Sequence, residues 1–89
     1  MSRAEKLLEQ MRSNPRGDWT IEDIIRVCRY FNDLGLECKS PKRGSHYKVA
    51  CPQVVDILTI PAGRPIKLVY VKAFLSIIDS ITDNEEGGE

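Results

Sequence analysis

The chain has 89 residues, with 13 basic and 13 acidic side chains, so its formal net charge is zero. A chain of this length builds one modest hydrophobic core, and an apolar content of 42% is typical of a globular protein rather than a disordered one. No apolar run approaches the roughly 18 residues that cross a bilayer, and the N-terminus lacks a signal-peptide core. We therefore expect a cytoplasmic protein without membrane contact.

The first predicted element is an N-terminal amphipathic helical arm, residues 1–16. Ser2 and Glu5 have the spacing of a capping box, and the apolar residues that follow recur at helical spacing. Pro15 and Gly17 break the pattern. We expect this arm to pack against the rest of the chain or to mediate homo-oligomer formation or contact with a partner protein.

A second helix is predicted from Thr20 to Leu34. Thr20 is a favourable N-cap residue, and Asp23 occupies the third helical position. Apolar residues form one continuous stripe along the helix. Gly35 then suits a left-handed residue that ends it.

Beyond Leu36 the hydrophobic period changes from that of a helix to that of a strand. Segments 36–40, 45–51 and 54–60 alternate or are rich in β-branched residues, and short turns join them into an antiparallel meander. Alternation in the second strand divides its residues between two faces. The apolar face holds Tyr47, Val49 and Cys51, and the polar face holds His46, Lys48 and Ala50. In the third strand Leu58 and Ile60 share one face, and Ile57 and Thr59 share the other. The sequence does not decide which of these two faces is buried.

The last predicted elements are a rigid connector at 61–67, a final amphipathic helix, and a disordered acidic tail at 83–89. The fold class is α+β, with residues 17–82 as the main domain. The expected order is α-β-β-β-α, with a three-stranded antiparallel sheet, helices on one of its faces, and an extra N-terminal helix. This is the layout of double-stranded-RNA-binding domains, which read backbone and shape.

The three cysteines, Cys28, Cys38 and Cys51, are widely spaced, and the chain has a single histidine. Zinc sites and disulfide frameworks need more closely grouped ligands or pairs. We expect free, buried thiols, no metal site and no cofactor.

Charge is distributed unevenly in spite of the zero net value. Residues 39–72 carry seven basic side chains and one acidic side chain, whereas the stretch that follows holds five acids and no base. Local potential governs the approach of a polyanion, so a neutral chain with a basic centre is compatible with RNA binding. We expect phosphate or backbone contacts from Lys42, Arg43, Gly44, Ser45, Lys48, Arg64 and Lys67.

Three short motifs occur in order between residues 34 and 79. Gly44-Ser45-His46 enters a strand, Ile60-Pro61 ends the next strand, and Arg64-Pro65-Ile66-Lys67 precedes the terminal helix. This ordered set resembles the HicA family of bacterial toxins. The resemblance implies a double-stranded-RNA-binding-like fold and an endoribonuclease (an mRNA interferase) that a HicB-type antitoxin holds inactive.

The resemblance places the catalytic histidine of the family at His46. Its unperturbed pKa, about 6.5, suits a general acid/base that takes a proton from an RNA 2′-hydroxyl without a metal. Many family members have further histidines where this chain has Tyr47 and Gly63. Two other interpretations of the residues stay open: a non-catalytic RNA-binding module of the same fold, and an exposed histidine with no chemistry.

Overall fold

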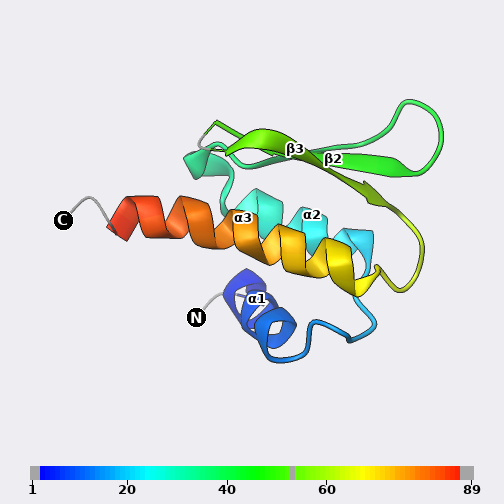
Figure 1. Ribbon diagram of the computed structural model, residues 1–89, viewed down its shortest axis with the longest axis horizontal. Helices are drawn as coiled ribbons and strands as arrows, with labels where there is room; N and C mark the ends of the chain where they lie inside the picture. Colours follow the sequence, from blue (N-terminus) through cyan, green and yellow to red (C-terminus); the bar gives the residue numbers. More distant parts are fainter. Residues whose placement is uncertain (1–2, 53, 87–89) are drawn as a thin grey trace.

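Within residues 3–52 and 54–86, which the structure describes, the fold contains three α-helices and a three-stranded antiparallel sheet (Figure 1). The structure is a computed structural model. Its elements are α1 (Arg3–Ser13), α2 (Ile21–Tyr30), the 3-10 helix η1 (Asn32–Leu34), β1 (Glu37–Lys39), β2 (His46–Cys51), β3 (Val54–Pro61) and α3 (Leu68–Glu86). The α+β class and the three-stranded antiparallel sheet expected from the sequence are confirmed.

α2 begins as the sequence predicts but ends earlier. The backbone N–H of Thr20 donates to the Asp23 carboxylate at 3.0 Å, and the Asp23 N–H donates to the Thr20 hydroxyl at 3.4 Å, which completes a capping box. The α-helix stops at Tyr30 instead of Leu34, because the chain tightens into the 3-10 helix η1. Asparagine and aspartate, which open η1, favour such local alternatives to the α-helix.

Gly35 has two reasons to be a glycine. Its φ of 94° lies in the left-handed region, where it ends η1. A Cβ atom at this position would also lie 2.6 Å from the Pro52 ring. The predicted left-handed residue is confirmed, and the contact with Pro52 fixes the end of η1 against the turn between β2 and β3.

The sheet is a meander in the order β1-β2-β3, with β2 at its centre. Glu37 pairs with Ala50 and Lys39 with Lys48 across the first ladder, and Tyr47 pairs with Ile60 across the second. The predicted faces of β2 are confirmed. Its inward face carries the half-buried Tyr47 and the buried Val49 and Cys51, and its outward face carries the exposed His46 and Lys48. In β3, Leu58 and Ile60 turn inward, whereas Ile57 and Thr59 are exposed.

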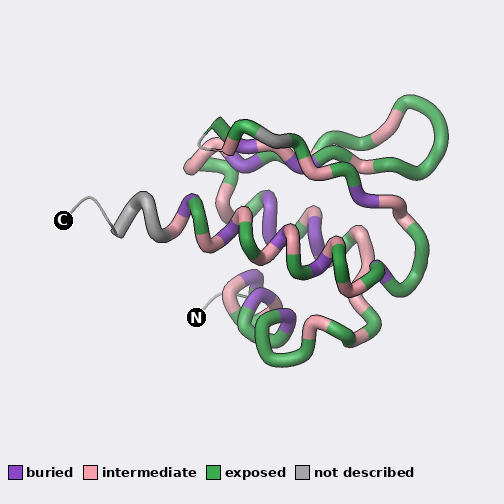
Figure 2. The backbone as a smooth tube through the Cα atoms, viewed as in Figure 1, coloured by how far each residue is buried: buried purple, intermediate pink, exposed green. Residues whose placement is uncertain are grey.

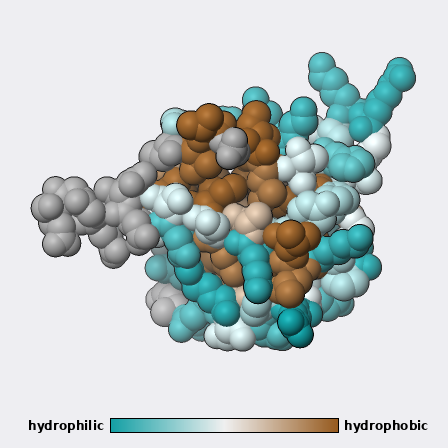
Figure 3. Space-filling model, in the orientation of Figure 1, coloured by the Kyte–Doolittle hydropathy of each residue, from teal (hydrophilic) through white to brown (hydrophobic). Residues whose placement is uncertain are grey.

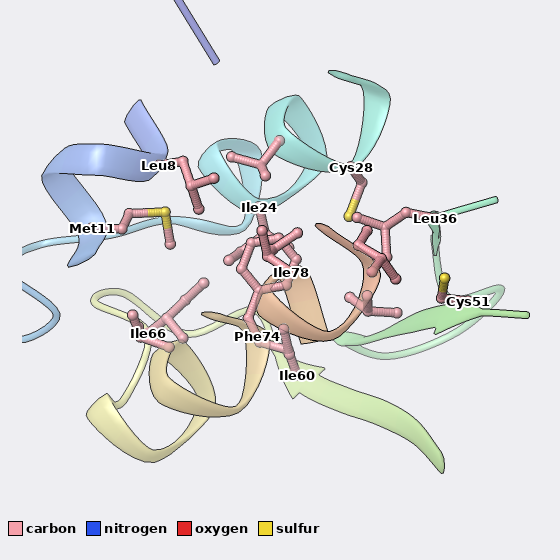
Figure 4. Packing of buried hydrophobic residues seen from close by; sticks show 14 residues of the cluster. Leu8, Met11, Ile24, Cys28, Leu36, Cys51, Ile60, Ile66, Phe74 and Ile78 are labelled. Carbon is pink, nitrogen blue, oxygen red and sulfur yellow. The ribbon is translucent and has the colours of Figure 1, made fainter. Parts of the chain in front are cut away.

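The molecule is layered. The sheet lies over α2 and α3, and α1 lies on the opposite side of these two helices (Figure 1). The buried positions are on the sides of the elements that face one another (Figure 2). The core cluster is formed by Leu8, Met11, Ile24, Val27, Cys28, Leu36, Val49, Cys51, Ile60, Ile66, Val71, Phe74, Ile78 and Ile81 (Figure 4). On α3 the buried stripe is formed by Val71, Phe74, Ile78 and Ile81, whereas Leu75 is half-buried.

α1 is part of this core. Met11 is fully buried and Leu8 nearly so, both within the common cluster. The guanidinium of Arg12 also forms an ion pair with Asp79 of α3 at 2.5 Å. The apolar side of α1 is thus covered within the chain itself. Ser2, the expected cap of this helix, lies outside the described residues, and homo-oligomer formation through α1 stays a prediction.

The C-terminal helix is longer than the sequence indicated. We expected disorder from Asp83 onward, but α3 continues to Glu86. The acidic stretch contains no proline, and its first glycine is Gly87, so nothing in the sequence breaks the helix before that position. Residues 87–89 of the expected tail lie outside the described residues.

Two large apolar side chains of the edge strand β3 face solvent. Val55 is 98% exposed and Ile57 is 59% exposed. Apolar surface is visible over this part of the molecule in Figure 3. Among the residues described, no helix is long and apolar enough to cross a membrane.

Candidate nucleic-acid interface

The loop between β1 and β2 positions the only histidine of the chain. Gly44 has a φ of 80°, and a Cβ atom there would meet nothing within 4 Å, so this position needs a glycine for its backbone conformation alone. The loop ends at Ser45, whose carbonyl oxygen accepts a hydrogen bond from the Ala62 N–H at 2.7 Å. This hydrogen bond connects the start of β2 to the end of β3.

His46 is the first residue of β2 and lies opposite Pro61 of β3. Two residues later on the same face, Lys48 lies opposite Thr59 on one side and Lys39 on the other. The side chains of His46, Lys48 and Lys39 are all exposed. The sheet register therefore sets one imidazole and two ammonium groups on a single outward face.

This face borders an open hollow of ≈ 450 Å³. Its lining residues are Lys39, Ser40, Pro41, Lys42, Arg43, His46 and Lys48. Four of them are cations, and the lining contains no carboxylate. Long hydrophilic side chains project from the region of the β1–β2 loop in Figure 3. The hollow thus combines four cations with an imidazole, which suits a phosphodiester.

The expected site residues divide into two groups. Lys42, Arg43, His46 and Lys48 lie together around this hollow, and Gly44 and Ser45 are exposed in the loop between them. Arg64 and Lys67 instead line a separate, smaller hollow of ≈ 210 Å³ in the connector before α3. Both hollows lie toward the same end of the molecule, where the β1–β2 loop and the connector are found in Figure 1.

Lys67 lies at the start of α3, and its carbonyl oxygen accepts from the N–H groups of Tyr70 and Val71. Helix N-termini attract phosphate through their unpaired N–H groups and the positive end of the helix dipole. Arg64 and Lys67 are both exposed and add two positive charges near this helix end. This second basic surface could therefore hold a different phosphate group of the same RNA strand from the one that would lie beside His46.

Sequence reasoning missed three lining residues: Lys39, Ser40 and Pro41. Lys39 follows the inward-facing Cys38, so alternation alone places it outward. Its position opposite Lys48 needed the register of the ladder, which the sequence leaves undetermined. Ser40 and Pro41 belong to a loop without periodicity, and no sequence signal marks them.

Tyr47 and Gly63, the two positions where many family members have further histidines, differ in their surroundings. Tyr47 pairs with Ile60 and faces the core, so its hydroxyl is not on the outward face that bears His46. Gly63 is exposed, and a Cβ atom there would have open space around it. Among the described residues no group of three or more histidine, cysteine or acidic side chains is arranged to hold a metal ion.

A larger hollow of ≈ 590 Å³ lies beside α1. Lys6, Glu9, Gln10, Ser13, Asn14 and Trp19 line it. This lining mixes both signs of charge and contains no histidine or thiol. Its larger size therefore does not make it the better candidate. The lining of the smaller hollow, with four cations and His46, is suited to a phosphate group.

Comparison with family models, with characterised proteins and with solved structures gave no match to this chain. The functional assignment consequently rests on the geometry of the site and on the resemblance carried by its own short motifs.

Proposed function

We propose that this protein is a HicA-like toxin, a metal-independent endoribonuclease that cleaves messenger RNA in the cytoplasm. The observation that carries the proposal is the exposed His46 at the edge of a hollow with four cations and no carboxylate. The order of helices and strands is compatible with a double-stranded-RNA-binding-like fold. We therefore propose a double-stranded-RNA-binding-like fold and an RNA-binding role for the basic residues.

His46 would act as the general base in this reaction. Its neutral imidazole takes the proton of a ribose 2′-hydroxyl, and the resulting oxygen attacks the adjacent phosphorus. Lys48, two residues along the same face, stabilises the negative charge that develops on the phosphoryl oxygens. The P–O5′ bond then breaks, and the leaving oxygen takes a proton from the imidazolium or from water.

The proposed regulator is a HicB-type antitoxin, as the family resemblance implies. Cations such as Lys42 and Arg43 protrude into solvent without ion pairs among the described residues. An antitoxin that offers carboxylates to this hollow would both neutralise the charge and occlude His46. No cofactor enters the proposal.

The catalytic assignment is tested by replacing His46 with alanine. Removal of a general base lowers the cleavage rate by about 100-fold or more, whereas substitution at an exposed position changes the free energy of unfolding by about 0.5 kcal/mol or less. Growth and transcript integrity are followed in bacteria that express either protein, and cleavage by purified protein is measured in the presence of EDTA. Equal toxicity of the two proteins, or toxicity from neither, contradicts the assignment.

The matched control is Lys6→Ala on α1, which is exposed and remote from the β1–β2 loop in sequence. We expect this variant to keep the cleavage rate of the wild type. Loss of activity in both variants would mean that the assay reports general damage to the protein and not the role of His46.

A second candidate function is a non-catalytic RNA-binding module, favoured by Gly63, which leaves one histidine for two proton transfers. Gly63→His supplies the second imidazole at a position with open space and no left-handed φ. If the chain is an impaired nuclease, this variant cleaves RNA faster than the wild type, and adding His46→Ala removes the gain. A module without catalysis binds RNA in all three forms and yields no cleavage products.

RNA binding itself has a salt signature. Replacing Lys39, Lys42 and Lys48 with glutamine removes three phosphate contacts, so the slope of log K against log salt should become shallower by about 2 for single-stranded RNA. The control carries glutamine at three exposed cations elsewhere: Arg3, Lys6 and Arg16. Binding is measured by fluorescence anisotropy across a salt series. Equal slopes for the two triple variants would exclude this hollow as the phosphate-binding surface.

A further inference from the structure

Two cysteines that are ten positions apart in the sequence lie beside the same hollow. Cys28 lies on α2 and Cys38 on β1, and the two thiols are close enough for each to shift the pKa of the other. Both side chains border a hollow of ≈ 430 Å³ between these elements. Sequence spacing does not reveal this pair, because it depends on how β1 packs against α2.

The two thiols differ in environment. Cys28 is only 3% exposed, whereas Cys38 is half-buried and accessible from the hollow. The hydrogen bond from Cys28 lowers the pKa of Cys38, although burial acts in the opposite direction. The same hydrogen bond, with burial, raises the pKa of Cys28. Arg29, Glu37 and Lys39 also line the hollow, so its charged groups include both signs.

We propose that Cys28 and Cys38 form an oxidation-sensitive dithiol, which hydrogen peroxide entering the hollow converts into an intramolecular disulfide. Cys38 is the attacking thiol and Cys28 the resolving thiol. The proposal rests on the hollow that the two side chains share and on the burial of Cys28 beside the more accessible Cys38. It is independent of the RNA-cleaving function proposed above.

The chemistry balances with one peroxide. The sulfur of Cys38 attacks a peroxide oxygen, the O–O bond breaks, and Cys38 becomes a sulfenic acid while one water leaves. The sulfur of Cys28 then attacks the sulfur of Cys38, an S–S bond forms, the S–O bond breaks, and a second water leaves with the thiol proton of Cys28. Two thiols are oxidised by two electrons, and the peroxide is reduced to two waters.

Cys51 provides a matched control within the same core. It is buried to nearly the same degree as Cys28, at 6% exposure, and its sulfur lies 3.9 Å from the Leu34 carbonyl oxygen. It does not border the hollow that Cys28 and Cys38 share. Figure 4 shows Cys28 and Cys51 on separate elements around Leu36.

The test treats the folded protein with hydrogen peroxide and counts thiols after denaturation. The reduced wild type has three thiols, and we expect one to remain after oxidation and all three to return after reduction. Digestion with trypsin under non-reducing conditions should yield residues 27–29 linked to residues 30–39. Cys51→Ser should give the same linked peptides, whereas Cys28→Ser should stop at a sulfenic acid on Cys38 that dimedone traps.

The peptide map of the wild type keeps the test decisive even if a cysteine variant folds poorly. A disulfide that contains residues 49–67, the tryptic peptide that carries Cys51, overturns the proposal. A link between two chains, seen as a dimer on non-reducing gels, overturns it as well. It is overturned equally if the wild type retains three thiols at a peroxide dose that fully oxidises dithiothreitol.

Discussion

At the residue scale, the clearest relation between sequence and conformation is at the two glycines of positive φ. The position of Gly35 after an apolar stripe predicts a left-handed helix end, and the structure confirms it. The positive φ of Gly44 was not predicted, although its place in a turn is compatible with it. The prediction for Gly35 uses only local sequence. The contact of Gly35 with Pro52 joins segments far apart in the chain, so local sequence carried no sign of it.

Gly35→Ala should destabilise the fold by about 1–3 kcal/mol, because the new methyl group is strained at positive φ and meets the Pro52 ring. Urea unfolding followed by circular dichroism measures the change. Gly63→Ala is the control, since its Cβ would have open space, and it should change the free energy of unfolding by less than about 0.5 kcal/mol. Equal effects of the two substitutions would refute this role of Pro52.

The residues of the candidate site were predictable in part for a similar reason. Alternation along β2 placed His46 and Lys48 on one face and Tyr47 on the other without knowledge of the neighbouring strands. The contribution of Lys39 and the approach of Cys38 to Cys28 depend on strand register and on helix–sheet packing. These are long-range properties, and no periodicity reports them.

At the scale of single elements, α2 shows where local signals suffice and where they fail. The sequence Thr20 to Asp23 predicts the capping box because its partners are three residues apart. The end of the α-helix at Tyr30 is set by competition between α and 3-10 hydrogen bonding near Asn32. That balance involves small energies and the contact of Gly35 with another segment, so the apolar stripe alone overestimates the length of the helix.

Thr20→Ala should lower the free energy of unfolding by about 1 kcal/mol, since it leaves an N–H group of the first turn without its side-chain acceptor. The partner substitution Asp23→Ala removes the reciprocal bond to the Thr20 N–H. A double-mutant cycle from thermal unfolding should show a coupling of about 0.5 kcal/mol or more. Strict additivity would show that the two bonds form independently, contrary to a reciprocal box.

At the scale of the whole molecule, the position of α1 shows whether the N-terminal helix is separate from the main domain. The sequence suggested an arm outside a domain of residues 17–82, because the break at Pro15 and Gly17 is strong. The structure includes Leu8 and Met11 in the common core, which is the first of the roles expected for this arm. Amphipathicity reveals that a helix has an apolar face but not which surface covers it, so the sequence alone left packing and contact with another chain both open.

Met11→Ala should therefore cost about 2–5 kcal/mol of stability, the range for removing a large, fully buried side chain. The exposed Lys6→Ala on the same helix serves as the control and should be close to neutral. Chemical denaturation of both variants measures the difference. A separate, undocked arm would make the two substitutions equally harmless.

The packing of α1 on α3 has a consequence for synthesis of the chain. Met11 and Arg12 are made well before Phe74 and Asp79, which belong to the same core cluster and the same ion pair. The core that α1 shares with α3 cannot close until α3 has left the ribosome, so the docking of α1 waits for α3. Translation that stops before α3 would release a chain with the apolar face of α1 uncovered, a substrate for chaperones and proteases.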